Sequence, residues 1–153
     1  MKKSVNFYQV KKTDVYNALF HLVRKSVEQN KRVLIQTGSI VMTKEIDEFL
    51  WSYDLSSFVP HNKLGDEDTS FSPIFITNEQ NDVKDYQYLF IMSNFKYSIA
   101  EICKFERTFV LFNNNDTEFL KATRTLWTDL DNFDGERRFW VEEQNGWKLN
   151  TYK

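Results

Sequence analysis

Short apolar runs alternate along the chain with stretches whose apolar residues recur every three to four positions. An apolar run bounded by polar residues predicts a buried strand, and the longer spacing predicts an amphipathic helix. Strands are expected at residues 5–10, 32–37, 73–77, 88–93 and 108–113. Helices are expected at residues 13–30, 42–51, 98–106 and 116–130. The C-terminal segment is expected to form a strand, a turn at 145–146 and a short return.

This alternation predicts the fold class. Strands joined through helices usually pair in parallel, and the helices then cover both faces of the sheet. We therefore expect an α/β fold, a single three-layer domain over residues 1–153 with a largely parallel sheet flanked by helices. The polar segment 52–72 lacks either periodicity and is expected to be a structured loop.

Composition narrows the class of protein. The 153 residues are 41% hydrophobic and 27% charged, with four Gly and two Pro, which is typical of one globular domain rather than a disordered chain. A formal net charge of −2 argues against a stand-alone nucleic-acid binder. A single cysteine excludes an intrachain disulfide and a cysteine metal cluster. No apolar run approaches a membrane span and no signal peptide is evident, so we expect a cytoplasmic protein.

The segment "LIQTGSIVMTKE" partly resembles a phosphate-binding loop, since an expected strand is followed by a glycine and an expected helix. Gly38 and Lys44 fit the spacing of a P-loop. Thr43 stands where the loop needs its second glycine, and Glu45 puts a negative charge where phosphate would bind. The pattern therefore favours an ordinary strand-to-helix turn.

The segment "DEFLWSYDLSSFVPHN", residues 47–62, contains residue types that suit a metal or acid–base site. Asp47, Glu48 and His61 are residue types that can hold a divalent cation. Adjacent helical positions diverge by about 100°, so Asp47 and Glu48 cannot both point into one site. A solvated helix face is the better interpretation. A small α/β metal-dependent nuclease or nucleotide enzyme using these three residues is kept as the alternative function.

Trp51 lies on the polar side of the helix expected at 42–51. The apolar face of that helix is formed by Met42, Ile46, Phe49 and Leu50. At about 100° per residue, Trp51 falls nearly opposite this face and beside Asp47. Such a ring is either covered by another segment or exposed to a partner, and the sequence leaves both possibilities open.

The helix expected at 116–130 carries cations beside an aromatic ring. Its apolar stripe is formed by Phe119, Thr123, Leu126 and Leu130. Lys121, Arg124 and Thr128 lie on the other side, flanked by Trp127 and Leu120. Cations edged by an aromatic ring suit an acidic peptide, although a solvated helix face is the commoner meaning of this pattern.

Taken in order, these segments resemble the chi subunit of bacterial DNA polymerase III over essentially the whole chain. The resemblance is carried most strongly by Lys31-Arg32-Val33-Leu34-Ile35, Asp47-Glu48-x-Leu50-Trp51 and Ser57-Phe58-Val59-Pro60-His61-Asn62. It implies one α/β domain of P-loop-NTPase-like topology without a functional P-loop. It also implies a protein with no catalytic activity of its own and no cofactor or metal.

The resemblance further implies a set of partners. Chi subunits belong to the clamp-loader complex and form a heterodimer with the psi subunit. They also bind the C-terminal tail of single-stranded DNA-binding protein, which is acidic and ends in Pro-Phe. The expected role is to bridge these partners during DNA replication, with DNA contacted only indirectly and no membrane involved.

Site residues follow from the resemblance position by position. Tail binding is expected from Trp51, Lys121, Arg124, Trp127 and Thr128. Psi binding is expected from Phe58, Val59, Pro60 and His61. Arg124 would pair with carboxylates of the tail, while Trp51 and Trp127 would wall the pocket for its terminal Phe. Two positions depart from the family pattern, because Lys121 is shifted by one residue and Thr128 replaces a basic residue.

Overall fold

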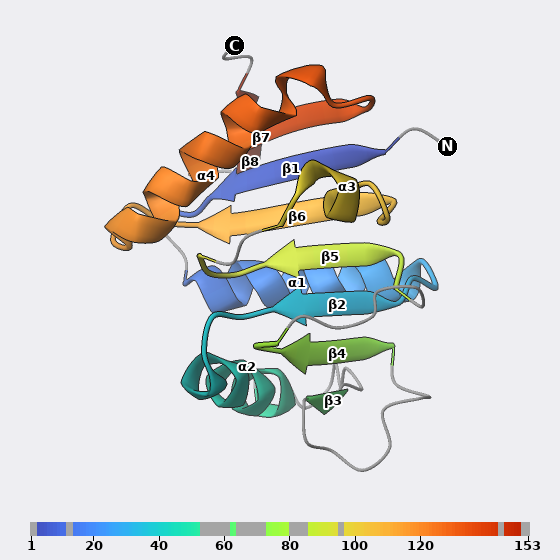
Figure 1. The fold of residues 1–153 in the computed structure, drawn as a ribbon. Coiled ribbons are helices and arrows are strands. Elements are labelled where there is room, and N and C mark those ends of the chain that lie inside the picture. Colours follow the sequence, from blue (N-terminus) through green and yellow to red (C-terminus); the bar gives the residue numbers. More distant parts are fainter. Residues whose placement is uncertain are drawn as a thin grey trace.

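The computed structural model describes residues 3–11, 14–52, 62–63, 73–79, 86–94, 97–143 and 146–150. Its strands form one eight-stranded sheet in the order β3-β4-β2-β5-β6-β1-β7-β8 (Figure 1). Neighbours from β3 to β7 are parallel, and β8 is antiparallel to β7. The strands are β1 (Ser4–Gln9), β2 (Val33–Gln36), β3 (Asn62–Lys63), β4 (Ile74–Thr77), β5 (Tyr88–Ile91), β6 (Arg107–Phe112), β7 (Glu136–Glu143) and β8 (Gly146–Asn150).

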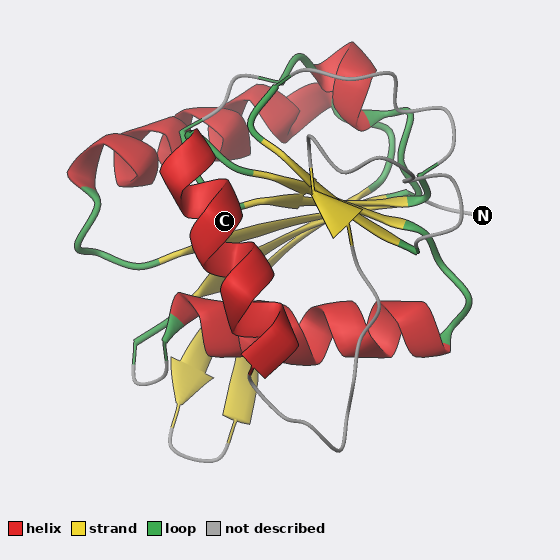
Figure 2. Cartoon of the chain, turned by 90° about the horizontal axis from the view of Figure 1, so that it is seen from below, coloured by secondary structure: helices red, strands yellow, loops and turns green. Residues whose placement is uncertain are grey.

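Helices lie on both faces of this sheet, which Figure 2 shows nearly along its edge. The helices are α1 (Val15–Glu28), α2 (Ile40–Ser52), α3 (Ile99–Ile102) and α4 (Thr117–Asp129), with a 3-10 turn at Leu130–Asn132. The connections through α1 and α2 move toward the β3 edge, whereas those through α3 and α4 move toward the β8 edge. Because parallel crossovers are right-handed, the two pairs of helices cover opposite faces.

Two apolar layers fill the space between the sheet and these helices. On the first face, Ile46 of α2 packs in one buried cluster with Ile35 and Phe90 of the strands. On the second face, Phe119 of α4 packs in another with Phe7. Every residue of β2, β4 and β5 is buried, which is expected of strands covered on both sides.

The predicted α/β fold with a largely parallel sheet and flanking helices is confirmed. The expected strands and helices are present, and their ends differ by a few residues. The helix expected at 98–106 ends at Ile102, and its start is fixed by a capping box between Ser98 and Glu101. The segment 52–72 is not a loop throughout, because α2 reaches Ser52 and β3 pairs with β4 inside it. The P-loop-NTPase-like detail of the topology stays a prediction.

Candidate functional site

Helix α4 presents the residues predicted from its spacing. Asp116 caps its start, where the carboxylate accepts a hydrogen bond from the backbone N–H of Phe119 at 3.1 Å. Phe119 and Thr123 are buried against the sheet, and Lys121 and Arg124 are exposed. The helix thus buries its apolar stripe and holds its cations in solvent.

A pocket of about 670 Å³ lies between α4 and the sheet, and we refer to it as the aromatic pocket. It is lined by Phe7, Gln9, Phe112, Asn114, Leu120, Thr123, Arg124, Trp127, Thr128 and Phe139. Among these lining residues Arg124 is the only charged side chain. A cavity with apolar walls and one cation can take a ligand that joins an apolar group to a carboxylate.

Trp127 is fixed in this pocket by ring contacts to the sheet. Its ring meets Phe7 edge-on with centroids 5.2 Å apart, and meets Phe139 edge-on at 5.9 Å. Phe7 and Phe139 are register partners on the adjacent strands β1 and β7. These edge-to-face contacts give Trp127 a defined orientation as one wall.

The carboxyl ends of the strands supply amide groups to the same pocket. The Gln9 side chain donates from Nε2 to Asn114 Oδ1 at 3.0 Å. Gln9 ends β1 and Asn114 follows β6, so both lie at the end of the pocket near the start of α4. A side-chain amide carries two N–H donors, so this pair retains donor capacity for a carboxylate.

Two further residues predicted for tail binding lie on α4. Thr128 lines the aromatic pocket, and its hydroxyl donates to the carbonyl oxygen of Arg124 at 3.2 Å. Lys121 is exposed and is not among the lining residues. The structure therefore brings Arg124, Trp127 and Thr128 together, and the contact expected from Lys121 stays a prediction.

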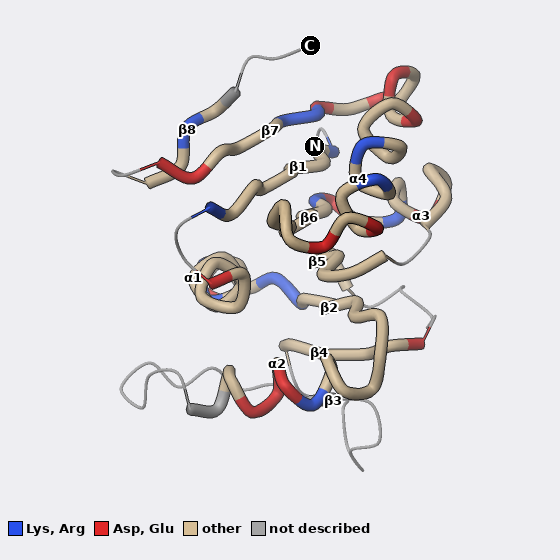
Figure 3. The backbone as a smooth tube through the Cα atoms, turned by 90° about the vertical axis from the view of Figure 1, so that its left-hand side faces the viewer, with Lys and Arg blue, Asp and Glu red and all other residues tan. Residues whose placement is uncertain are grey.

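The expected pairing of Trp51 and Trp127 in one pocket stays a prediction, because the structure describes the backbone of Trp51 within α2 and not its side chain. Trp51 lies in the last turn of α2, and Ile46 and Leu50 of that helix pack on the first face of the sheet. Trp127 packs on the second face. Acidic residues also outnumber basic ones along α2, which opposes an acidic ligand there (Figure 3). Spacing along each helix could not reveal which face the helix covers.

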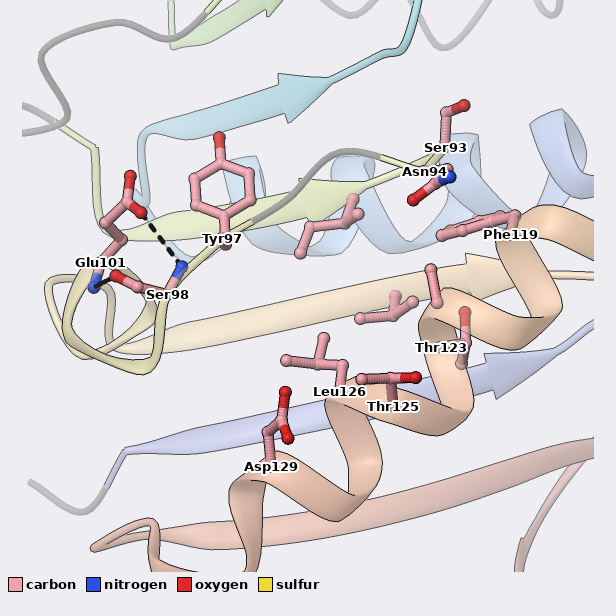
Figure 4. A pocket seen from close by; sticks show the side chains of 13 residues that line it. Ser93, Asn94, Tyr97, Ser98, Glu101, Phe119, Thr123, Thr125, Leu126 and Asp129 are labelled. Atoms are coloured by element: carbon pink, nitrogen blue, oxygen red, sulfur yellow. Dashed lines mark hydrogen bonds between the residues drawn. The ribbon is translucent and has the colours of Figure 1, made fainter.

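A second pocket of about 630 Å³ lies on the other side of α4 (Figure 4). Glu101 of α3 and Asp129 of α4 line it together with hydroxyl groups, including those of Tyr97 and Thr125. Two carboxylates make this pocket unsuitable for an acidic peptide. Residues such as Thr125 therefore provide matched controls on the same helix.

The predicted psi-binding residues Phe58, Val59, Pro60 and His61 lie outside the described residues. Asp47 and Glu48 of the alternative enzyme site are on α2, where Asp47 is half-buried and Glu48 is exposed. Within the described ranges, no group of three or more His, Cys, Asp or Glu side chains is placed to hold a metal ion.

The turn between β2 and α2, which partly matches a P-loop in sequence, is filled by its own side chains. The hydroxyls of Thr37 and Thr43 are 2.7 Å apart, and Ser39 Oγ accepts from the backbone N–H of Met42 at 3.1 Å. A Cβ atom on Gly38 would lie 2.5 Å from Ser93 Oγ, so this glycine is needed for close packing. The local geometry agrees with a strand-to-helix turn.

The sequence did not single out Phe7, Gln9, Asn114 and Phe139 as site residues. Alternation along β1 and β7 could have placed Phe7 and Phe139 on one face, but not under α4. Their meeting with Trp127 depends on the pairing of β1 with β7, whose residues are far apart in the chain.

Comparison with known proteins decides the family. Residues 1–136 match the family model described as "DNA polymerase III chi subunit, HolC". The chain belongs to the DNA polymerase III chi-subunit family. It is also 25% identical over 121 residues to "Probable DNA polymerase III subunit chi" of Rickettsia prowazekii (strain Madrid E), covering 78% of this chain and 72% of that protein. Membership of the chi family supports an accessory role in DNA replication.

The fold is shared more widely than the family. The structure of "Mss116p DEAD-box helicase domain 2 bound to an RNA duplex" superposes with a TM-score of 0.51 at 10% identity. The match covers 90% of this chain but only 64% of the helicase-domain chain. At this identity the likeness concerns the fold alone.

In the described part of this chi-family chain, no helix is long and apolar enough to cross a membrane.

Proposed function

We propose that this chi-family protein is a non-catalytic adaptor of the DNA polymerase III clamp loader. One surface binds the acidic C-terminal tail of single-stranded DNA-binding protein, and another binds the psi subunit. The observation that carries the tail-binding part is the aromatic pocket, in which Arg124 and Trp127 flank one cavity.

The chemistry of the aromatic pocket fits a peptide that ends in Phe. The terminal ring would pack among the aromatic walls, where burial of apolar area favours binding. Arg124 would pair with the terminal carboxylate, which is a charge-assisted and potentially bidentate interaction. Gln9 and Asn114 line the same pocket as Arg124 and would supply N–H donors to the carboxyl end of the peptide.

The psi subunit would bind through Phe58, Val59, Pro60 and His61, in the segment that follows α2. Helix α2, which precedes this segment in the chain, packs on the face of the sheet opposite α4. Separate surfaces would let one adaptor hold both partners at once, and Trp51 stays a predicted contact of the tail. The bridge would keep the polymerase at template strands coated by single-stranded DNA-binding protein.

The tail site is tested by replacing Arg124. We expect Arg124→Ala to weaken binding of a synthetic acidic Pro-Phe peptide by about tenfold or more, because a charged hydrogen bond is lost. Thr125→Val is the matched control, since Thr125 is the next residue of α4 but lines the second pocket. Isothermal titration calorimetry measures both. Equal affinities of Arg124→Ala and wild type would refute the assignment.

The alternative enzyme would need Asp47, Glu48 and His61 to converge. Asp47 and Glu48 are consecutive on α2 and differ in exposure, so the geometry favours a helix side rather than a shared metal site. A metal-dependent nuclease activity lost in Glu48→Ala would revive this alternative.

A further inference from the structure

Arg137 of β7 lies directly against the ring of Trp127, yet it is not among the residues that line the aromatic pocket. Its guanidinium carbon is 4.4 Å from the centroid of the Trp127 ring. Among aromatic side chains, Trp is the best partner for a cation placed over its ring. Trp127 is therefore held by a cation as well as by the rings of Phe7 and Phe139.

The same guanidinium is also tied to the end of α4. Arg137 Nη1 donates to the backbone carbonyl of Trp127 at 2.5 Å and to Asp131 Oδ1 at 2.8 Å. The Arg137 side chain is 25% exposed, whereas that of Asp131 is 63% exposed. A cation at the last turn of a helix satisfies carbonyls that have no partner within the helix. One side chain thus fixes both the backbone and the ring of Trp127.

We propose that Arg137 is a positioning residue for tail binding, holding the Trp127 ring in the orientation that walls the aromatic pocket. This inference rests on the proposed function of that pocket. Arg137 acts through Trp127 and needs no contact with the ligand. The planar guanidinium of Arg137 contacts the Trp127 ring and donates to the Trp127 carbonyl at the same time. The ammonium group of a lysine is a compact charge and cannot make both contacts in this way.

The test uses the full chain labelled with 5-fluorotryptophan. The chain has four Trp residues, and each gives its own ¹⁹F resonance. The Trp127 resonance is assigned with Trp127→Phe. A synthetic acidic peptide ending in Pro-Phe is titrated into wild type, Arg137→Met and Arg137→Lys. We expect Arg137→Met to shift the Trp127 resonance of the free protein and to weaken binding of the peptide about tenfold, which lies within the range that cation–π contacts span between exposed and desolvated sites. Compared with Arg137→Met, Arg137→Lys should recover part of the wild-type Trp127 resonance position and part of the peptide affinity.

Asp131→Asn is the matched control, because it removes the exposed ion pair but keeps the stack and the carbonyl contact. It should leave the affinity and the Trp127 resonance unchanged. Wild-type affinity in Arg137→Met, or weaker binding with an unmoved Trp127 resonance, would overturn the role of Arg137 alone. Absence of binding by wild type would overturn the proposed pocket and this role with it. If Arg137→Met does not fold, the peptide affinity and the Trp127 resonance of Arg137→Lys are compared with those of wild type, and the same outcomes apply.

Discussion

Arg124 owes its proposed role to the rings that surround it. Helical spacing predicted that Arg124 is exposed beside Trp127, because both positions follow from the geometry of one helix. The spacing could not predict Phe7 and Phe139, which come from strands near opposite ends of the chain. Only the folded sheet brings these rings to α4. The cation of the candidate site was therefore predictable, whereas Phe7, Phe112 and Phe139 of its apolar wall were not.

A buried phenol gives the fold a dependence on alkaline pH. Burial raises the pKa of Tyr8 from 10.0 to about 12, although Arg107 and Arg138 oppose the shift. The folded protein therefore favours the neutral phenol, and this stabilisation is complete below pH 10. It is lost as the pH rises through 10 to 12, because the unfolded chain ionises first. We expect the loss to approach about 2 kcal/mol of unfolding free energy.

The measurement is denaturant unfolding between pH 9 and about pH 11.5, with Tyr8→Phe beside wild type. Tyr8→Phe keeps the ring that stacks with Phe109 and Trp140, but it has no proton to lose. Its unfolding free energy should fall less steeply with pH. Tyr16, whose pKa is also raised to about 12 by burial and by Glu45, is present in both proteins. Parallel curves would contradict this account of Tyr8.

At the scale of elements, α2 and α4 look alike in sequence but lie on opposite faces of the sheet. Each helix carries an apolar stripe and a Trp near its C-terminal end. The direction of the crossover decides the face, and that direction depends on strand order, which local patterns do not contain. The fold class and most elements were predictable from sequence, because buried strands and amphipathic helices are local patterns.

This separation leads to a prediction for Trp51. If the aromatic pocket alone holds the tail, Trp51→Ala should leave the affinity for the tail peptide unchanged, because α2 packs on the face away from that pocket. Trp127→Ala should weaken the same peptide by about tenfold or more, as expected for an aromatic hot spot. Fluorescence anisotropy with a labelled peptide compares the two variants. A loss in Trp51→Ala equal to that in Trp127→Ala would show that both rings reach one ligand.

At the scale of the whole molecule, a parallel sheet with helices on both faces provides separate surfaces on a small domain. The aromatic pocket lies on the α4 side, and the segment proposed to bind psi begins from α2. An adaptor needs this arrangement because two partners on one surface would compete. The proposed tail partner, a peptide with an acidic, aromatic end, fits the apolar walls of the aromatic pocket and its single lining cation.

The most direct test of the central claim is calorimetric titration of the purified protein with two synthetic peptides. One carries the acidic tail of the cognate single-stranded DNA-binding protein, and the other lacks only the terminal Phe. The account predicts saturable one-to-one binding of the complete tail and little binding of the shortened one, because the ring and the relocated carboxylate no longer fit the pocket together. Equal binding of both peptides, or binding of neither by the folded protein at low salt, would contradict the proposed tail site.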